Sequence, residues 1–287
     1  MKTSASRLLL NFYLFVFFAF MLAPLAIMGG GALNDSRFPS VYPWKGFTDR
    51  WFIDLWNDQR MWDSSFNTLM VALAVVILAV PIGTAGAIVI NSLQGRARSF
   101  LYGMMVAPIL TPGAVIGIST LLFWNELNVP AGLHLSVLGQ VAYISAYVML
   151  LVFARLQSFD RDLEEAALDL GASHWQVIRR IVAPHLYPAI GASALVAFFQ
   201  SLENYNVTLF TRGNSVTLTV YVGSKLRTGF TPTINAMALI LIVITIFGAV
   251  VYEILRRREA RYNDYLDMMA QRAEREALAQ KLGTVRG

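Results

Sequence analysis

The chain has 287 residues, of which 56% are hydrophobic and only 14% are charged. Soluble domains carry about 25% charged residues, so this composition excludes an ordinary soluble protein and indicates an all-α integral membrane protein. There is no cysteine, which excludes disulfides and thiolate metal sites. The three histidines, His134, His174 and His185, are not spaced as ligand pairs, so we expect no metal. The net charge of +5 comes from basic residues at the ends of apolar runs, so we expect no nucleic-acid partner.

Six apolar runs are long enough to cross a membrane core, which takes about 20 helical residues. We expect one transmembrane domain over residues 1–255 and a charged cytoplasmic tail over residues 256–287. A cleaved signal peptide would also begin with basic residues, but the length of the first run favours a retained span. The six runs are Leu8–Met28, Phe66–Ile90, Phe100–Phe123, Val137–Ala154, Ala189–Phe210 and Ile234–Leu255.

The loops between these runs differ in their content of Lys and Arg. Sixteen basic residues fall on the side of the two termini, eight of them in the tail, against seven on the opposite side. Because cytoplasmic loops carry an excess of positive charge, this bias places both termini in the cytoplasm. The outer loop over residues 32–65 is rich in Trp and Pro, which is typical of an anchor at the membrane interface.

Prolines and glycines interrupt the third run, at Pro108, Pro112, Gly113 and Gly117. The spacing of the two glycines lets another helix approach closely. Packing within the chain and a dimer face are both compatible with this pattern, and we favour packing within the chain.

The fifth run contains the polar residues Gln200, Glu203 and Asn204. Their spacing predicts that they share one helical face with Val207. A carboxylate inside a membrane costs about 2.5–3.5 kcal/mol at the helix centre, so Glu203 should face a polar cavity or a partner.

Three interpretations of Glu203 follow. In the first, Glu203 lines the solute path and attracts a cationic solute, which forms hydrogen bonds with Asn204 or Gln200. Alternatively the span ends early and Glu203 lies among the lipid headgroups. The third interpretation is a structural salt bridge to Arg212 or Lys225.

A polar interval separates the fourth and fifth runs. Its composition predicts a helix over Glu164–Leu170, which Gly171 ends. Ser173 is placed to cap a second helix from His174 to about Ala183, before Pro184. We therefore predict two short helices joined by a turn.

This interval resembles the EAA loop of permease subunits of binding-protein-dependent ABC importers. The residues that carry the resemblance are Glu164, Glu165, Ala166, Ala167, Gly171, Ile181 and Pro184, and Ala183 departs from the leucine usual in the family. The resemblance implies a type I ABC importer permease fold of six transmembrane helices, with a coupling loop over residues 160–187 that docks on an ATPase. It also implies a bacterial inner membrane, a second permease subunit, two ATPase subunits and a periplasmic solute-binding protein.

Further segments are similar to spermidine/putrescine (PotC-like) permease subunits. They are Gly46-Phe47-Thr48 with Trp51, Ser158-Phe159-Asp160, Phe230-Thr231-Pro232 and Asn235-Ala236. Where those subunits tend to have paired aspartates, this chain has Glu203-Asn204. The resemblance implies import of a small cationic or amine-containing solute by alternating access.

No phosphate-binding G-x-x-x-x-G-K-[ST] motif occurs in the chain. We therefore expect no enzyme activity in this subunit, with ATP bound and hydrolysed by a separate subunit. The competing hypothesis is a proton-coupled secondary transporter with Glu203 as the proton carrier. Such folds often contain paired inverted repeats, and none is evident here.

Overall fold

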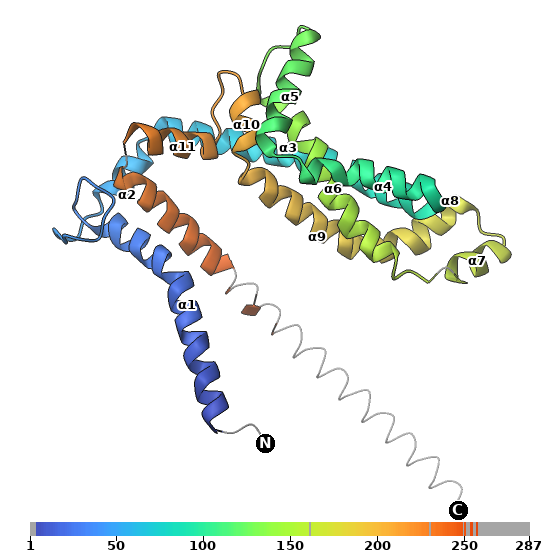
Figure 1. Cartoon of the computed structure of the whole chain (residues 1–287), viewed down its shortest axis with the longest axis horizontal. Helices are drawn as coiled ribbons and strands as arrows, with labels where there is room; N and C mark the ends of the chain where they lie inside the picture. Colours follow the sequence, from blue (N-terminus) through green and yellow to red (C-terminus); the bar gives the residue numbers. More distant parts are fainter. Residues whose placement is uncertain are drawn as a thin grey trace, which may run out of the picture. The chain divides into compact units, whose positions relative to one another are not determined.

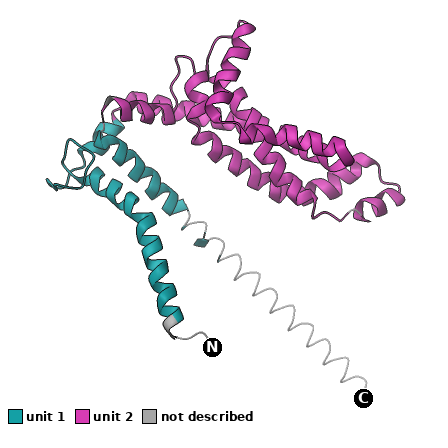
Figure 2. Ribbon diagram, viewed as in Figure 1, with its two compact units in different colours: residues 1–56, 230–287 teal, residues 57–229 magenta. Residues whose placement is uncertain are grey.

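The computed structural model describes residues 4–160, 162–229, 231–248, 250, 253, 254 and 257. The tail predicted over residues 256–287 therefore lies outside the described residues, except for residue 257. The chain divides into two compact units, residues 1–56 with 230–287 and residues 57–229 (Figure 2). All named elements in the described part are helices (Figure 1), as the composition predicted.

The first unit contains α1 (Ser4–Leu33), α2 (Arg50–Trp56) and a helix over Pro232–Gly248. α1 coincides with the first apolar run. A Cβ atom on Gly31 would lie 2.5 Å from Nδ2 of the Asn235 side chain, so the missing side chain of Gly31 leaves room for Asn235 of the last helix beside α1. The end of the sixth apolar run extends beyond the described part of that helix.

The loop after α1 is organised by Asn34, whose side chain is completely buried. Its Nδ2 donates to the carbonyl of Pro43 at 3.1 Å, and its Oδ1 accepts from the backbone N–H of Lys45 at 2.8 Å. The indole N–H of Trp51 donates to the Asn34 carbonyl at 2.9 Å. Trp51 is therefore buried in the loop, whereas Trp56 is exposed as an interfacial anchor should be.

The second unit is built on α3 (Gln59–Ser92), α6 (Leu133–Leu156) and α9 (Ala183–Leu202), with α4 (Gly95–Leu110) beside α6 (Figure 1). α3 and α6 coincide with the second and fourth apolar runs. Their common core consists of Val75, Ala79, Ile144, Val148, Met149 and Val152, all fully buried. Four described helices (α1, α3, α6 and the one ending with α9) are long and apolar enough to cross a membrane, and α4 and α5 together would form a fifth span.

The third apolar run does not form one straight span. It is divided into α4 and α5 (Gly113–Glu126), which are bent by 103° at Thr111 and Pro112. Thr111 is extended (φ −86°, ψ 129°), as the residue before a proline prefers, and Pro112 supplies no N–H to continue the helix. The third run is therefore broken at the prolines that interrupt it.

The coupling interval begins as predicted. α7 (Asp162–Asp169) is followed by Gly171 at φ +84°, a left-handed conformation that favours glycine. Ser173 caps α8 (His174–Val177), and the Gln176 side chain accepts from the backbone N–H of Ser173 at 2.8 Å, which completes a capping box.

The second coupling helix does not stop before Pro184. α8 continues through a π-helical turn, η1 (Ile178–Val182), directly into α9, so a 29-residue helix runs over His174–Leu202. In this wide turn the N–H of Ala183 bonds to the carbonyl of Ile178, and Pro184, which has no N–H, occupies the first turn of α9. The coupling helix and the fifth span are one element.

The fifth run also ends earlier than predicted. α9 stops at Leu202, and a separate short helix, α10 (Asn206–Thr211), precedes α11 (Leu218–Thr228). Within this unit, α7 and α8 lie at the opposite end from α10 and α11 (Figure 1). A side chain on Gly117 would lie 3.0 Å from the Val207 carbonyl, so the small residues of α5 pack against α10 within the chain, as predicted.

Candidate functional site

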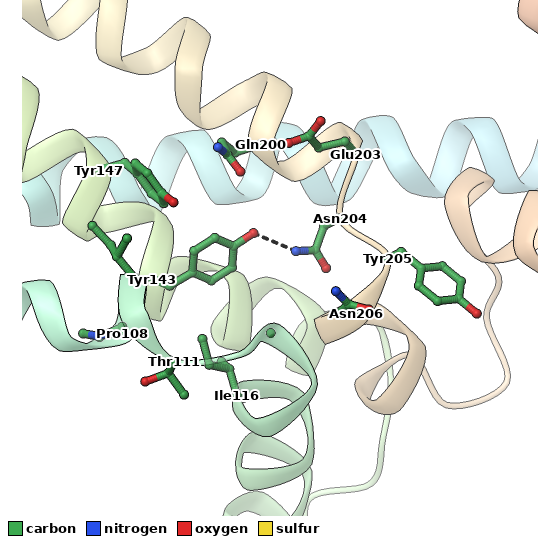
Figure 3. A pocket seen from close by; sticks show the side chains of 12 residues that line it. Pro108, Thr111, Ile116, Tyr143, Tyr147, Gln200, Glu203, Asn204, Tyr205 and Asn206 are labelled. Atoms are coloured by element: carbon green, nitrogen blue, oxygen red, sulfur yellow. Dashed lines mark hydrogen bonds between the residues drawn. The ribbon is translucent and has the colours of Figure 1, made fainter. Parts of the chain in front are cut away.

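A cavity of about 290 Å³ lies in the second unit where the two helix breaks meet. The α4–α5 break contributes Thr111, the α9–α10 break contributes Glu203 and Asn206, and α6 contributes Tyr143 and Tyr147 (Figure 3). Backbone groups that leave helical pairing are tolerated inside a membrane where they line a cavity. Residues at the breaks of two separate spans therefore converge on one polar site.

The predicted residues Gln200, Glu203 and Asn204 all line this cavity. They are not brought together by one helical face, because α9 ends before Glu203, which forms its C-cap. Val207 is fully buried and approaches Gly117 and Gly139 instead. The prediction that Val207 shares their face was wrong.

The surroundings of Glu203 bear on the three interpretations. The helix does end early, as the second interpretation required. Lys225 pairs with Asp58 at 3.7 Å, and Arg212 donates from Nη1 to the carbonyl of Ser215 at 2.7 Å. Among the described residues Glu203 forms no ion pair, so the salt bridge predicted by the third interpretation is absent from that part of the chain. Glu203 is exposed and lines the cavity, which is compatible with the first and the second interpretation.

Asn204 is held on both sides of its amide group. Its Oδ1 accepts from the Thr208 hydroxyl at 3.1 Å and from the Thr208 backbone N–H at 3.2 Å. Its Nδ2 donates to the Tyr143 hydroxyl at 2.7 Å, the contact drawn in Figure 3. The Thr219 hydroxyl donates to the backbone carbonyl of Asn204 at 2.8 Å. Asn204 thus fixes the start of α10 and one wall of the cavity at the same time.

A second polar cluster joins the start of α3 to α11. Burial disfavours the charged form of Asp58, but the hydrogen bond from Tyr221, the backbone N–H of Met61 and the charge of Lys225 together lower the pKa of the carboxyl below its usual range. Burial and the contact with Asp58 raise the pKa of Tyr221 above its ordinary value. The cluster is therefore an ionised carboxylate bound to a neutral phenol at neutral pH.

The predicted coupling residues lie on α7, its turn and the following helix. Glu165 and Ala166 are exposed, and Gly171 provides the left-handed turn. Ile181 lies within the π-helical turn, and Pro184 is the second residue of the α9 helix that follows it. The same end of the unit exposes three large apolar side chains, Leu163, Leu170 and Trp175, which is the kind of surface a protein partner covers.

Two tyrosines of the cavity were not predicted as site residues. Tyr143 and Tyr147 are four residues apart on α6, with ring centroids 6.3 Å apart in an edge-to-face arrangement. The signal available in the sequence was a fourth run with polar atoms at positions spaced for one helical face, including Gln140. Tyr205 and Asn206, which flank the helix break, also line the cavity.

Comparison with known proteins identifies the chain's relatives. Residues 79–261 match the model of the family described as "Binding-protein-dependent transport system inner membrane component". The spermidine/putrescine transport system permease protein PotC of Haemophilus influenzae is 30% identical over 249 residues, covering 86% of this chain and 96% of that protein. The putrescine transport system permease protein PotI of Escherichia coli is 33% identical over 253 residues, covering 84% and 89%.

A solved bacterial ABC transporter involved in the import of the polysaccharide alginate shares the fold, with a TM-score of 0.66 at 16% identity. That alignment covers 90% of this chain and 98% of the solved chain. The fold expectation, an ABC importer permease of type I, is confirmed, and nothing favours a proton-coupled secondary transporter. The chain therefore belongs to the binding-protein-dependent transport system inner membrane components, as a multi-pass permease subunit of an ABC importer.

Proposed function

We propose that this permease imports a small polyamine into the cytoplasm, and that Gln200, Glu203 and Asn204 lie on its solute path. The observation that carries the proposal is the meeting of Glu203 with Tyr143 and Tyr147 in one cavity. A carboxylate attracts an ammonium group, and tyrosine rings attract cations through their faces. The names of the two relatives, a spermidine/putrescine permease and a putrescine permease, support the same class of solute.

The helix over His174–Leu202 supports a route for coupling. It extends from the turn after Gly171 to the residue before Glu203, so a movement of its first turns reaches the cavity through one continuous element. We propose that Glu164, Glu165, Ala166, Ala167, Gly171, Ile181 and Pro184 seat the coupling loop on an ATPase. ATP binding there would drive alternating access at the cavity.

The remaining parts of the importer follow from this assignment. ATP is bound and hydrolysed by two separate ATPase subunits, and this chain performs no catalysis. A second permease subunit completes the membrane part, and a periplasmic solute-binding protein delivers the solute. Residues 1–255 form the transmembrane domain in contact with membrane lipid, and both termini and the tail 256–287 are cytoplasmic, in agreement with the distribution of Lys and Arg.

The test is uptake of labelled putrescine and spermidine by the complete importer in proteoliposomes. Glu203→Gln removes the charge and keeps the shape, so uptake should fall at least tenfold, while Glu203→Asp should retain part of it. Glu126→Gln is the matched control, since Glu126 is an exposed carboxylate in the last turn of α5. Wild-type uptake by Glu203→Gln at equal protein content would refute the role of Glu203. Absence of ATP-dependent uptake of both amines by the wild-type importer would refute the solute class.

A further inference from the structure

We propose that Thr208 and Gln140 are positioning residues for the solute cavity, which they do not line themselves. They act through Asn204 and Tyr143, which do line it. The role in solute recognition rests on the proposed function above, whereas the positioning itself can be measured without any solute.

The observation is a directed chain of hydrogen bonds between four segments of the fold. Ser201 Oγ donates to Gln140 Oε1 at 2.6 Å, and Gln140 Nε2 donates to Thr208 Oγ1 at 2.9 Å. Thr208 Oγ1 donates to Asn204 Oδ1 at 3.1 Å, and Asn204 Nδ2 donates to the Tyr143 hydroxyl at 2.7 Å. Each group donates to the next, so the chain runs from the last turn of α9 through α6 and α10 into the cavity.

The direction of the chain has a chemical consequence at its end. A threonine hydroxyl has one proton, and here Gln140 occupies Thr208 as an acceptor, so that proton is directed to Asn204. The Asn204 oxygen must then face Thr208, and its NH₂ group must face Tyr143. The Tyr143 oxygen accepts this bond, which holds the ring in place and leaves the phenol proton for the cavity that Glu203 also lines. The hydrogen-bond chain thus sets the position of Tyr143 and leaves its proton free to donate to an acceptor in the cavity.

Burial makes the inner members of the chain depend on one another. Gln140 and Thr208 are each 1% exposed, so water cannot replace a lost partner. A buried donor or acceptor that loses its partner costs more than the bond itself contributes. Removing the Thr208 hydroxyl should therefore leave the Gln140 amide nitrogen without its acceptor. The Asn204 oxygen would keep only the bond from the Thr208 backbone N–H, so Asn204 and the Tyr143 hydroxyl bound to it would be held less firmly.

The fold supplies a matched control one turn along the same pair of helices. Ser136 Oγ and Thr211 Oγ1 form a buried hydrogen bond of 2.9 Å between α6 and α10, and Thr211 is completely buried. Neither residue lines the cavity. Thr211→Val therefore removes a hydroxyl of the same type, from the same helix and the same kind of environment, without interrupting the series of hydrogen bonds.

The experiment uses the absence of cysteine in the chain. Gln200→Cys places a single thiol in the cavity of the complete importer, and its rate of reaction with a small cationic thiol reagent reports the local geometry in membranes. We expect Thr208→Val to change this rate about two- to tenfold, the equivalent of one hydrogen bond. Thr208→Ser, which keeps the hydroxyl, and Thr211→Val should both leave it unchanged. Equal rates in Thr208→Val and Thr211→Val would overturn the proposal, even if one of them lowers the yield of protein.

Uptake adds a readout for the solute. With the native Gln200 restored, Thr208→Val should raise KM for putrescine about two- to tenfold and change Vmax less, with recovery in Thr208→Ser. A changed labelling rate together with an unchanged KM would overturn the role in solute recognition. If the wild-type importer takes up neither amine, the proposed function fails, and the labelling rates alone decide whether Thr208 positions the cavity.

Discussion

The Tyr221 hydroxyl donates a 2.5 Å hydrogen bond to the Asp58 carboxylate, although 163 residues separate the two in the sequence. Asp58 also caps α3 by accepting from the backbone N–H of Met61 at 3.2 Å. One carboxylate therefore begins the longest helix of the second unit and holds α11 against it. Lys225, one turn further along α11, adds a longer ion pair of 3.7 Å. The short bond from Tyr221 is the stronger restraint, because a partly exposed ion pair contributes little.

Replacement of Tyr221 by Phe should destabilise this connection by about 1.5–3 kcal/mol, since it removes a hydrogen bond to a charged group. The expected result is a lower melting temperature of the purified importer at pH 7. Tyr42→Phe provides the control, because Tyr42 is 89% exposed. Equal melting temperatures for the two variants would show that the bond to Asp58 does not stabilise the fold.

The pKa shifts of Asp58 and Tyr221 predict how the loss of stability in Tyr221→Phe depends on pH. The folded-state pKa of Asp58 is lowered, so the ionised carboxylate stabilises the fold above its unfolded pKa of about 3.9, and this stability is lost as the pH falls through the folded pKa. The pKa of Tyr221 is raised, so its contribution is complete below its unfolded pKa of about 10 and is lost only as the pH rises through the higher folded-state pKa. The difference between wild type and Tyr221→Phe should thus stay constant from about pH 5 to 9 and shrink below about pH 4. A difference that varies between pH 6 and 8 would point to another group.

A second prediction concerns Gly171, which ends α7 in a Schellman motif. The N–H of Ala172 bonds to the carbonyl of Ala167 at 3.0 Å, and that of Gly171 to Leu168 at 2.9 Å. A Cβ atom added to Gly171 would have no neighbouring atom within 4 Å, so a larger residue would be strained by its positive φ and not by a clash. Gly171→Asn should therefore preserve function, because Asn tolerates this conformation, whereas Gly171→Val should not.

The measurement is the ratio of amine taken up to ATP hydrolysed in proteoliposomes. In Gly171→Val this ratio should fall several-fold while the amount of inserted protein stays the same. Gly191→Val adds the same bulk at an open position of α9 without a positive φ, and it should keep the wild-type ratio. A normal ratio in Gly171→Val would mean that the turn geometry does not matter for coupling.

Local signals explain how much of the fold could be predicted from the sequence. Apolar runs predicted the long helices, because the side chains of a spanning helix face either the protein core or the lipid, and both are apolar. Gly171 and Ser173 were predicted correctly, since a left-handed turn and an N-cap depend only on neighbouring backbone atoms. The polar character of Glu203 was likewise visible in a single segment.

Contacts between distant segments were not predictable in the same way. The hydrogen bond of Gln140 to Thr208 joins residues 68 positions apart, and either side chain alone is an ordinary polar residue in a span. The early end of the fifth span was one of the interpretations left open, because residues 200–206 are mostly polar. The short helix after the break was not predictable, because the Asn204 side chain and the distant Thr219 satisfy the backbone where the first helix stops. Tyr143 becomes a cavity residue only through that break.

The last prediction tests the continuous coupling helix at Pro184. Without a backbone N–H, Pro184 cannot bond to the carbonyl four residues earlier, and the π-helical turn Ile178–Val182 accommodates this missing hydrogen bond. Pro184→Ala restores that N–H and allows a regular α-helix. A regular helix would rotate α8, and with it Trp175, relative to α9. We therefore expect Pro184→Ala to fold at least as stably as wild type but to transmit ATP hydrolysis to uptake less efficiently.

Pro188→Ala is the control, because Pro188 is also an exposed proline inside α9, one turn beyond the wide segment. Both variants should show an unchanged or raised melting temperature, since a proline inside a helix costs stability. Only Pro184→Ala should lower the ratio of uptake to hydrolysis, because only this position ends the π-helical turn. If both prolines lower the ratio equally, the flexibility of α9 as a whole carries the coupling. If neither does, the π-helical turn has no part in it, and the orientation of α8 is fixed by its contact with the ATPase alone.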